Sequence, residues 1–200
     1  MKGLKPSPRA AHAATSVESS QIVIYGGANG NGTLAREDLF LFDMKKGEEY
    51  SNWLIVPTSG PNPGKRYGHS INFVKPNLVI FGSNSGDEML NDVWILSIEI
   101  TPFSWQKLDF KSEVPSPRQY HSASECLSGN AAGMIIVFGG RTVEKSNEND
   151  LWGLRKHRDG KWEWVKAISK SKENIQPAGR HQVILIIGFS IRHYLQTQLY

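Results

Sequence analysis

"NDVWILSIEITPFSW", Asn91–Trp105, decides the fold of this chain because two variants of the same stretch occur elsewhere in it. One is "NDLWGLRKHRDGKWEW" at Asn149–Trp164, and the other is "EDLFLFDMKKGEEYSNW" at Glu37–Trp53. In each, an aspartate precedes an apolar strand with aromatic side chains, and a tryptophan follows after a turn. Self-similarity of this kind is the sequence signature of a repeat architecture.

A second marker, Arg-x-x-His after a proline, recurs ahead of each stretch. Its strings are "PSPR", "PGKR" and "PSPR", with the arginines 57 and 52 residues apart. Proline cannot donate to a central ladder, so each string belongs between two sheets. We predict that the arginines bond to carbonyls or acids between units and that the histidines are structural hydrogen-bonding groups rather than a metal triad. The marker residues are Arg9 and His12, Arg66 and His69, and Arg118 and His121.

An apolar run that ends in glycine lies between these two markers. The runs are "IVIYGG" (Ile22–Gly27), "LVIFGS" (Leu78–Ser83) and "MIIVFGG" (Met134–Gly140). They are continuous rather than alternating, which favours short strands buried on both faces. The glycines allow positive φ where the chain turns away, and Ser83 breaks that pattern, so we expect a different turn there. The glycine markers are Gly26, Gly27, Gly82, Gly139 and Gly140.

The closing tryptophans, Trp53, Trp105 and Trp164, supply large rings that can wedge one sheet against the next. Four strands in a unit of about 50 residues are typical of a propeller blade. The predicted fold is therefore all-β: a β-propeller segment of three four-stranded antiparallel blades plus an incomplete fourth. The predicted boundaries are 1–56, 57–111, 112–169 and, for an atypical start of a fourth blade, 170–200.

Together the markers resemble the kelch-repeat family across residues 6–167. Several segments, above all "WGLRKHRDGKWEWVKA", are more narrowly similar to the kelch-containing Ser/Thr phosphatases of plants and apicomplexan parasites. That resemblance implies an N-terminal propeller followed by a metal-dependent phosphatase domain. The catalytic motifs of such domains, Gly-Asp-x-His-Gly, Gly-Asp-x-Val-Asp-Arg-Gly and Gly-Asn-His-Glu, are absent from these 200 residues. The resemblance thus implies the regulatory part without the phosphatase.

Composition narrows the function classes further. Residues 1–140 carry 12 Lys/Arg against 13 Asp/Glu, whereas residues 141–200 carry 11 against 6. The basic residues of the last third alternate with acids and accompany no nucleic-acid motif, which argues against nucleic-acid binding. Cys126 is the only cysteine, and neither a signal peptide nor a membrane span is recognisable. We expect a cytoplasmic or nuclear protein.

Protein partners are the expected ligands, and we predict no catalytic residue, cofactor or metal site. Candidate partner contacts are the basic residues assigned to loops, because binding residues concentrate on loops held by a rigid scaffold. These are Arg36, Arg141, Arg155, Lys156 and Arg158. A ring of the marker arginines could instead bind an anion.

Three function classes remain open. The leading one is a protein-interaction and regulatory module of a kelch-type phosphatase. The alternatives are a kelch scaffold or adaptor, cytoskeletal or of the ubiquitin-ligase type, and a propeller enzyme. Because a propeller needs roughly four to eight blades to close, three blades leave sheet faces exposed. We therefore predict that this chain is marginally stable or self-associates.

Overall fold

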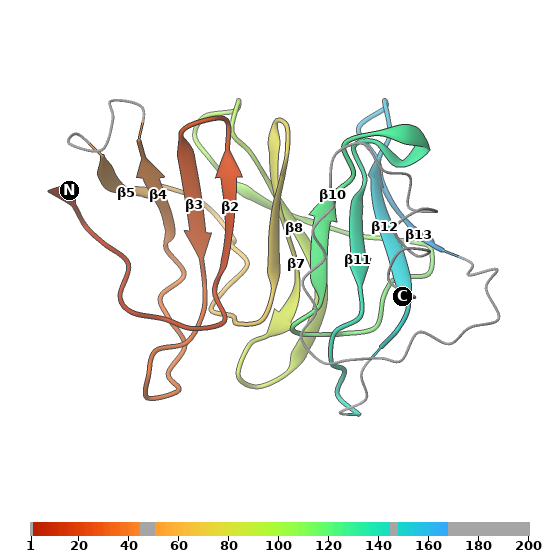
Figure 1. The fold of residues 1–200 in the computed structure, drawn as a ribbon, viewed down its shortest axis with the longest axis horizontal. Helices are drawn as coiled ribbons and strands as arrows, with labels where there is room; N and C mark the ends of the chain where they lie inside the picture. Colours follow the sequence, from red (N-terminus) through yellow and green to blue (C-terminus); the bar gives the residue numbers. More distant parts are fainter. Residues whose placement is uncertain (1, 45–50, 145–147, 168–200) are drawn as a thin grey trace, which may run out of the picture.

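The computed structural model describes residues 2–44, 51–144 and 148–167, and it places three twisted sheets side by side (Figure 1). The sheet order is β1-β5-β4-β3-β2 for sheet one, β6-β7-β8-β9 for sheet two and β10-β11-β12-β13 for sheet three. A single 3-10 turn, Gly129–Ala131, is the helical element of the described residues. The strands are β1 (Lys2–Gly3), β2 (Ala13–Val17), β3 (Gln21–Tyr25), β4 (Leu39–Asp43), β5 (Asn52–Val56), β6 (Ser70–Val74), β7 (Asn77–Asn84), β8 (Met89–Ser97), β9 (Trp105–Leu108), β10 (Ser122–Glu125), β11 (Ile135–Phe138), β12 (Leu151–Lys156) and β13 (Trp162–Lys166).

Sheets two and three confirm the predicted four-stranded antiparallel blade. The prediction is incomplete for sheet one, because β1 adds a fifth strand there. It runs parallel to β5, with Gly3 opposite Trp53. The edge of β5 offers an unpaired ladder, and the N-terminal segment occupies it. Gly3 permits this approach, since a Cβ atom there would lie 2.0 Å from the Trp53 carbonyl oxygen.

The core consists of two layers, one between sheets one and two and one between sheets two and three. The ring of Trp105 packs on Tyr25 of sheet one, with centroids 5.9 Å apart, and Trp164 packs on Phe81 of sheet two at 4.8 Å. We call the face that meets the following sheet the forward face and the opposite one the rear face. Trp105 and Trp164 lie on rear faces against the preceding sheet, which confirms their predicted role as wedges. Trp53 packs on Phe42 of its own sheet, and no preceding sheet is among the described residues.

Strands β2, β6 and β10 are neighbours, since β6 contacts both β2 and β10. From β2 to β5, β6 to β9 and β10 to β13, each later strand lies farther from this shared centre. The register also matches from sheet to sheet, because Phe42, Leu96 and Leu154 stand opposite Trp53, Trp105 and Trp164. The repeat in the sequence is therefore a repeat in space.

Ser83 has a backbone unlike that of its two glycine counterparts, as predicted. Its φ is 147°, against 98° at Gly27 and 97° at Gly140. Strand β7 continues through this position to Asn84, and its pairing with β8 shifts register between Phe81 and Ser83. A side chain disfavours the left-handed turn that glycine adopts, so the strand runs on instead.

The predicted fourth blade, 170–200, lies outside the described residues. Within the described part of the chain, no helix has the length and apolar character needed to cross a bilayer.

Candidate protein-interaction surface

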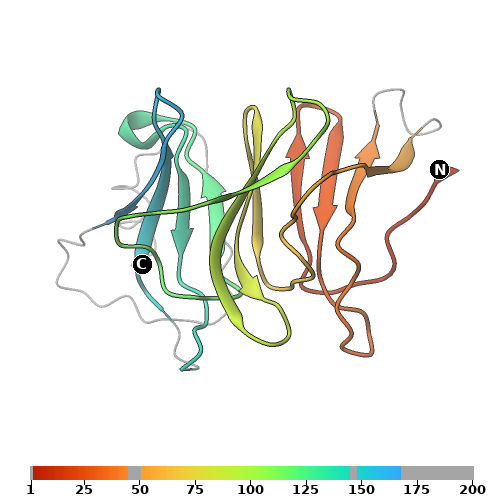
Figure 2. The same cartoon turned by 180° about the vertical axis from the view of Figure 1, so that it is seen from behind.

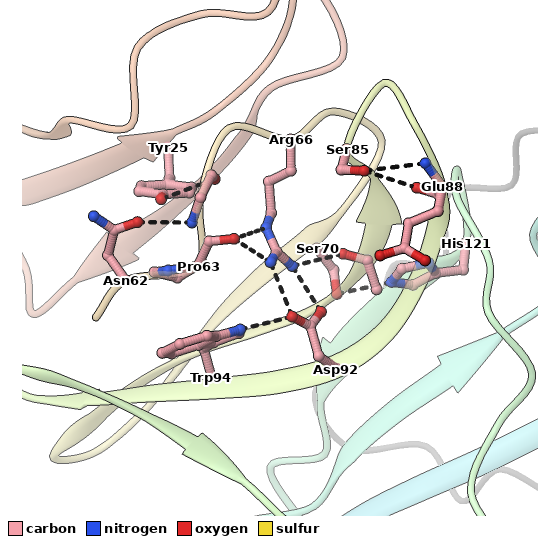
Figure 3. Close-up of polar contacts among 12 residues, drawn as sticks. Tyr25, Asn62, Pro63, Arg66, Ser70, Ser85, Glu88, Asp92, Trp94 and His121 are labelled. Carbon is pink, nitrogen blue, oxygen red and sulfur yellow. Dashed lines mark hydrogen bonds and ion pairs between the residues drawn. The ribbon is translucent and has the colours of Figure 1, made fainter.

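A buried ion pair joins the segment before sheet two's first strand to its third strand, β8 (Figure 3). The Arg66 guanidinium, 1% exposed, donates to both oxygens of Asp92 at 2.9 and 3.0 Å. It also donates to the carbonyls of Pro63 and Gly82. The indole of Trp94 donates to the same carboxylate at 2.7 Å, so Asp92 is held from two sides.

Sheet three repeats this arrangement. Arg118, fully buried, donates to Asp150 at 2.5 and 2.8 Å and to the Gly139 carbonyl at 2.9 Å, and Trp152 donates to Asp150 at 2.6 Å. Burial alone would raise the pKa of Asp150, but the donors on Arg118 and Trp152 outweigh it and lower that pKa. The carboxylate therefore stays charged beside its arginine.

Arg66 and Arg118 bond to carbonyls and carboxylates, as predicted. The prediction that these partners lie between units is wrong. Their partners lie in the same sheet rather than between sheets: each arginine precedes the first strand of its sheet, Asp92 lies within the third strand, β8, and Asp150 immediately precedes the third strand, β12. Neither guanidinium is open to an anion, since both are buried against their own carboxylate. The anion-binding alternative therefore finds no support at Arg66 or Arg118.

The marker histidines are buried packing groups in sheets two and three. His121 Nε2 lies 2.9 Å from the Ser70 hydroxyl of the preceding sheet, and His69 packs edge-on against Tyr25 at 5.9 Å. Burial, reinforced by the nearby arginine, lowers the pKa of each to about 3. His12 is exposed instead. No cluster of three metal-ligating side chains occurs among the described residues.

Backbone hydrogen bonds tie the loops at one end of the sheets into a frame. In each sheet the residue after the marker arginine exchanges two backbone bonds with the residue after Gly27, Ser83 or Gly140, for example Tyr67 with Asn84 at 3.0 Å each. Bonds between sheets add to these: the Ser83 amide donates to the Arg118 carbonyl at 3.0 Å, and the Tyr120 amide donates to the Gly68 carbonyl at 2.8 Å. We call this edge, the lower one in Figure 1, the loop end.

The loop end presents basic and aromatic side chains from several sheets. Arg141 is exposed, and its backbone pairs with Gln119 at 2.8 and 3.0 Å. Arg36 is 85% exposed and pairs with Asp38 at 3.3 Å. The half-buried rings of Tyr67 and Tyr120 lie 6.2 Å apart on neighbouring sheets. Sequence reasoning missed this aromatic pair, although both tyrosines stand inside the Arg-x-x-His marker.

The other three candidate residues lie at the opposite end. Arg155 and Lys156 are the last two residues of β12 rather than loop residues, which corrects their assignment, and Arg158 follows in the turn before β13. Lys156 lies over the Trp162 ring at 5.8 Å. Figure 2 shows this hairpin in blue at the upper edge, away from the loops below. The structure therefore separates the predicted contact set into two groups.

Comparison with known proteins gives consistent matches. The family model described as the KLHDC2/KLHL20/DRC7 Kelch-repeats domain matches residues 1–188. The chain is 38% identical over 181 residues to serine/threonine-protein phosphatase BSL2 of Arabidopsis thaliana, which covers 90% of this chain and 16% of that protein. It is 31% identical over 159 residues to an F-box/kelch-repeat protein of the same plant, covering 75% and 32%. Human host cell factor 2 is 27% identical over 199 residues, covering 86% and 24%.

Proposed function

The chain belongs to the kelch-repeat family, and we propose that it is a protein-interaction and regulatory module, the propeller part of a kelch-type Ser/Thr phosphatase. The similarity to the plant phosphatase supports this assignment, because it extends over 90% of the chain. The chain spans 16% of the length of the plant phosphatase and 32% of the length of the F-box/kelch-repeat protein. The connection to a phosphatase is therefore part of the proposal.

The observation that carries the binding role is the loop end. Its loops are joined by paired backbone bonds within and between sheets, so their backbone is held in place before any partner arrives. Prearranged contacts reduce the entropy that a binding site loses on association. Arginine and tyrosine, which occur here at Arg36, Arg141, Tyr67 and Tyr120, are the residue types enriched at protein interfaces.

We assign no catalytic role to these residues and place the protein in the cytoplasm or nucleus. The motifs that supply metal ligands in kelch-type phosphatases do not occur in the 200 residues. A single cysteine suits a reducing compartment.

The test is binding of the purified chain to a kelch-type phosphatase catalytic domain, measured by calorimetry. We expect the double variant Arg36→Glu, Arg141→Glu to weaken binding about tenfold, which corresponds to about 1.4 kcal/mol. Arg155→Glu, Arg158→Glu is the matched control at the opposite end and should leave the affinity unchanged. Absence of binding, or equal loss in both variants, contradicts the proposal.

A second candidate function is an adaptor, favoured by the 31% identity to an F-box/kelch-repeat protein. Affinity capture with the wild-type chain separates the two. Ubiquitin-ligase subunits that depend on the loop end would favour the adaptor, and phosphatase subunits or their phosphoprotein substrates would favour the regulatory module.

A further inference from the structure

Three dipeptides in the chain place a serine or threonine directly before a proline. They are Ser7-Pro8, Thr101-Pro102 and Ser116-Pro117. A hydroxyl in this position is what proline-directed protein kinases phosphorylate. Ser7 and Ser116 each stand two residues before a marker arginine, whereas Thr101 does not. The two serines are therefore the candidates for a phosphate that the protein itself could bind.

The position two residues before the marker arginine is open in all three sheets. Ser7 and Ser116 are exposed. Gly64 is their counterpart in sheet two, and a Cβ atom there would meet no other atom within 4 Å. Sheet two packs against a neighbour on both sides. The accessibility of this position is therefore a property of the repeat and not of an end of the array.

The two serines differ in whether the neighbouring arginine already holds a carboxylate. Arg118 Nη2 donates to Ser116 Oγ at 2.9 Å and to Asp150 at 2.8 Å, so a phosphate on Ser116 would meet a like charge at the same donor. Arg9 Nη2 donates to Ser7 Oγ at 3.2 Å, and its other bonds go to the carbonyls of Ser7 and Gly26. Within the described part of the chain no carboxylate bonds to Arg9, so its charge is available to a phosphate on Ser7.

The segments around the two serines also differ in how firmly they are attached. Among the described residues, 5–9 make no backbone–backbone hydrogen bond. Near Ser116, the Asn91 side chain donates to the Pro115 carbonyl at 3.0 Å, and the Arg118 amide donates to the Leu90 carbonyl at 3.2 Å. A kinase can therefore draw the Ser7 segment into its active site without breaking a backbone bond, whereas the Ser116 segment is tied on both sides.

We propose that Ser7 is a phosphorylation site for a proline-directed protein kinase and that Arg9 binds the phosphate. In the reaction, Ser7 Oγ forms a bond to the γ-phosphorus of ATP, the bond from that phosphorus to the bridging oxygen breaks, ADP leaves with the electron pair, and the hydroxyl proton is released. The product carries a charge of about −1.5 to −2 and strong acceptor oxygens, which match the Arg9 donor. Asn29 now accepts from Ser7 Oγ at 3.2 Å, and its amide can turn to donate to the phosphate instead.

Ser7 lies at the loop end, because its hydroxyl bonds to Asn29 in the loop between β3 and β4. Phosphorylation therefore adds negative charge to the surface that carries Arg36 and Arg141. Resting on the proposed function, we expect the phosphorylated chain to bind the partner of these arginines more weakly. The site itself requires no partner, so it can be tested on the chain alone.

The first test incubates the folded chain with a proline-directed kinase and ATP and locates the phosphate by mass spectrometry. We expect Ser7 to be modified at least tenfold faster than Ser116. Peptides of residues 3–13 and 112–122, which both contain Pro-Ser-Pro-Arg, should react at similar rates, because neither is held by a fold. Pro8→Ala should slow modification of Ser7 at least tenfold. No phosphate on Ser7 of the folded chain, or equal rates at the two serines in it, overturns the proposal.

The second test measures the role of Arg9 by phosphorus NMR of the phosphorylated chain, with Ser116→Ala present so that Ser7 gives the signal. A bound guanidinium favours the dianion, so the second pKa of the phosphate should lie below its ordinary value of about 6. Arg9→Ala should return that pKa to about 6, and circular dichroism checks that this variant keeps the fold. An unchanged pKa in Arg9→Ala would overturn the role of Arg9. Neither test contains a binding partner, so its failure is distinct from failure of the proposed function.

Discussion

Sheets two and three hold their marker arginines in one way, and sheet one holds its arginine in another. Arg66 and Arg118 are buried, and each donates two bonds to an aspartate that a tryptophan also holds. Arg9 is only half-buried; it donates to the Gly26 carbonyl at 3.0 Å and lies over the Phe40 ring at 5.1 Å.

The comparison shows what the buried pair requires. In sheet one, Phe40 occupies the position that Trp94 and Trp152 occupy in the other two sheets. The indole donor to the aspartate is therefore missing at this position. The exposed Arg36 pairs with Asp38 instead. Among the described residues no sheet covers this rear face, and Arg9 is only half-buried. A guanidinium can be buried only where its charge is paired and its donors are satisfied. The same sequence marker therefore produces two electrostatic environments, decided by the neighbours.

The largest expected effect on the free energy of unfolding distinguishes the buried ion pair of sheet three from the exposed pair of sheet one. Asp150→Ala should lower the free energy of unfolding by about 3–5 kcal/mol, because it leaves the buried Arg118 charge without a partner. Asp38→Ala should lower it by less than about 1 kcal/mol, because its pair with Arg36 is exposed. Urea denaturation measures both. Equal effects in the two sheets would show that the distinction is wrong.

The hydrogen bond from the Trp152 indole to Asp150 accounts for part of the expected difference in stability between the two sheets. Trp152→Phe should cost about 2 kcal/mol, within the range for a hydrogen bond to a charged group. Loss of this donor also raises the pKa of Asp150, so acid unfolding should begin at a higher pH. Phe40→Trp in sheet one is the reciprocal variant and should give no comparable gain. Urea and acid titrations of the two variants, followed by tryptophan fluorescence, test this.

The buried histidines predict a pH dependence of stability that comes from sheets two and three. The pKa values of His69 and His121 are about 3 in the folded state, below the ordinary 6.5, so the unfolded chain binds more protons between these values. Stability is therefore complete above about pH 6.5 and falls by about 1.4 kcal/mol per pH unit for each histidine on acidification. Unfolding measured at pH 7 and pH 5 should show this slope.

His121→Asn should remove about half of that slope. A variant at the exposed His12 is the matched control. A slope that persists in a double variant at His69 and His121 would assign the pH dependence to other groups.

The smallest effect is expected at Arg9. Arg9→Ala should lower the free energy of unfolding by less than about 1 kcal/mol, since a cation–π contact at a partly exposed site contributes about 0.5–1 kcal/mol. Thermal unfolding followed by circular dichroism checks this. A loss as large as that of Asp150→Ala would mean that sheet one shares the buried environment after all.

Much of the fold could be predicted because the markers repeat in a fixed order. Trp53, Trp105 and Trp164 lie at the same register of their sheets, and the altered backbone at Ser83 follows from the replacement of a glycine. The fifth strand, β1, could not be predicted, since Lys2 and Gly3 carry no strand pattern and pair only because β5 leaves an edge open.

The candidate site was predictable only in part. Sequence position gave no indication that Arg36 and Arg141 lie at one end while Arg155, Lys156 and Arg158 lie at the other, because exposed basic residues look alike in a sequence. The Tyr67–Tyr120 pair combines residues 53 positions apart, and only the stacking of sheets brings their rings within 6.2 Å.

The sequence by itself determined the repeat, the all-β architecture, the four antiparallel strands of each unit and the apolar side chains of the core. These features are local, since each depends on continuous apolar runs and on glycine, proline and tryptophan positions within about 50 residues. Only the tertiary structure decided which arginine is buried, which aspartate it meets, which face of each sheet is covered and which loops share an end. These depend on the neighbouring sheet, because burial and pairing are properties of what packs against a side chain and not of its place in the repeat.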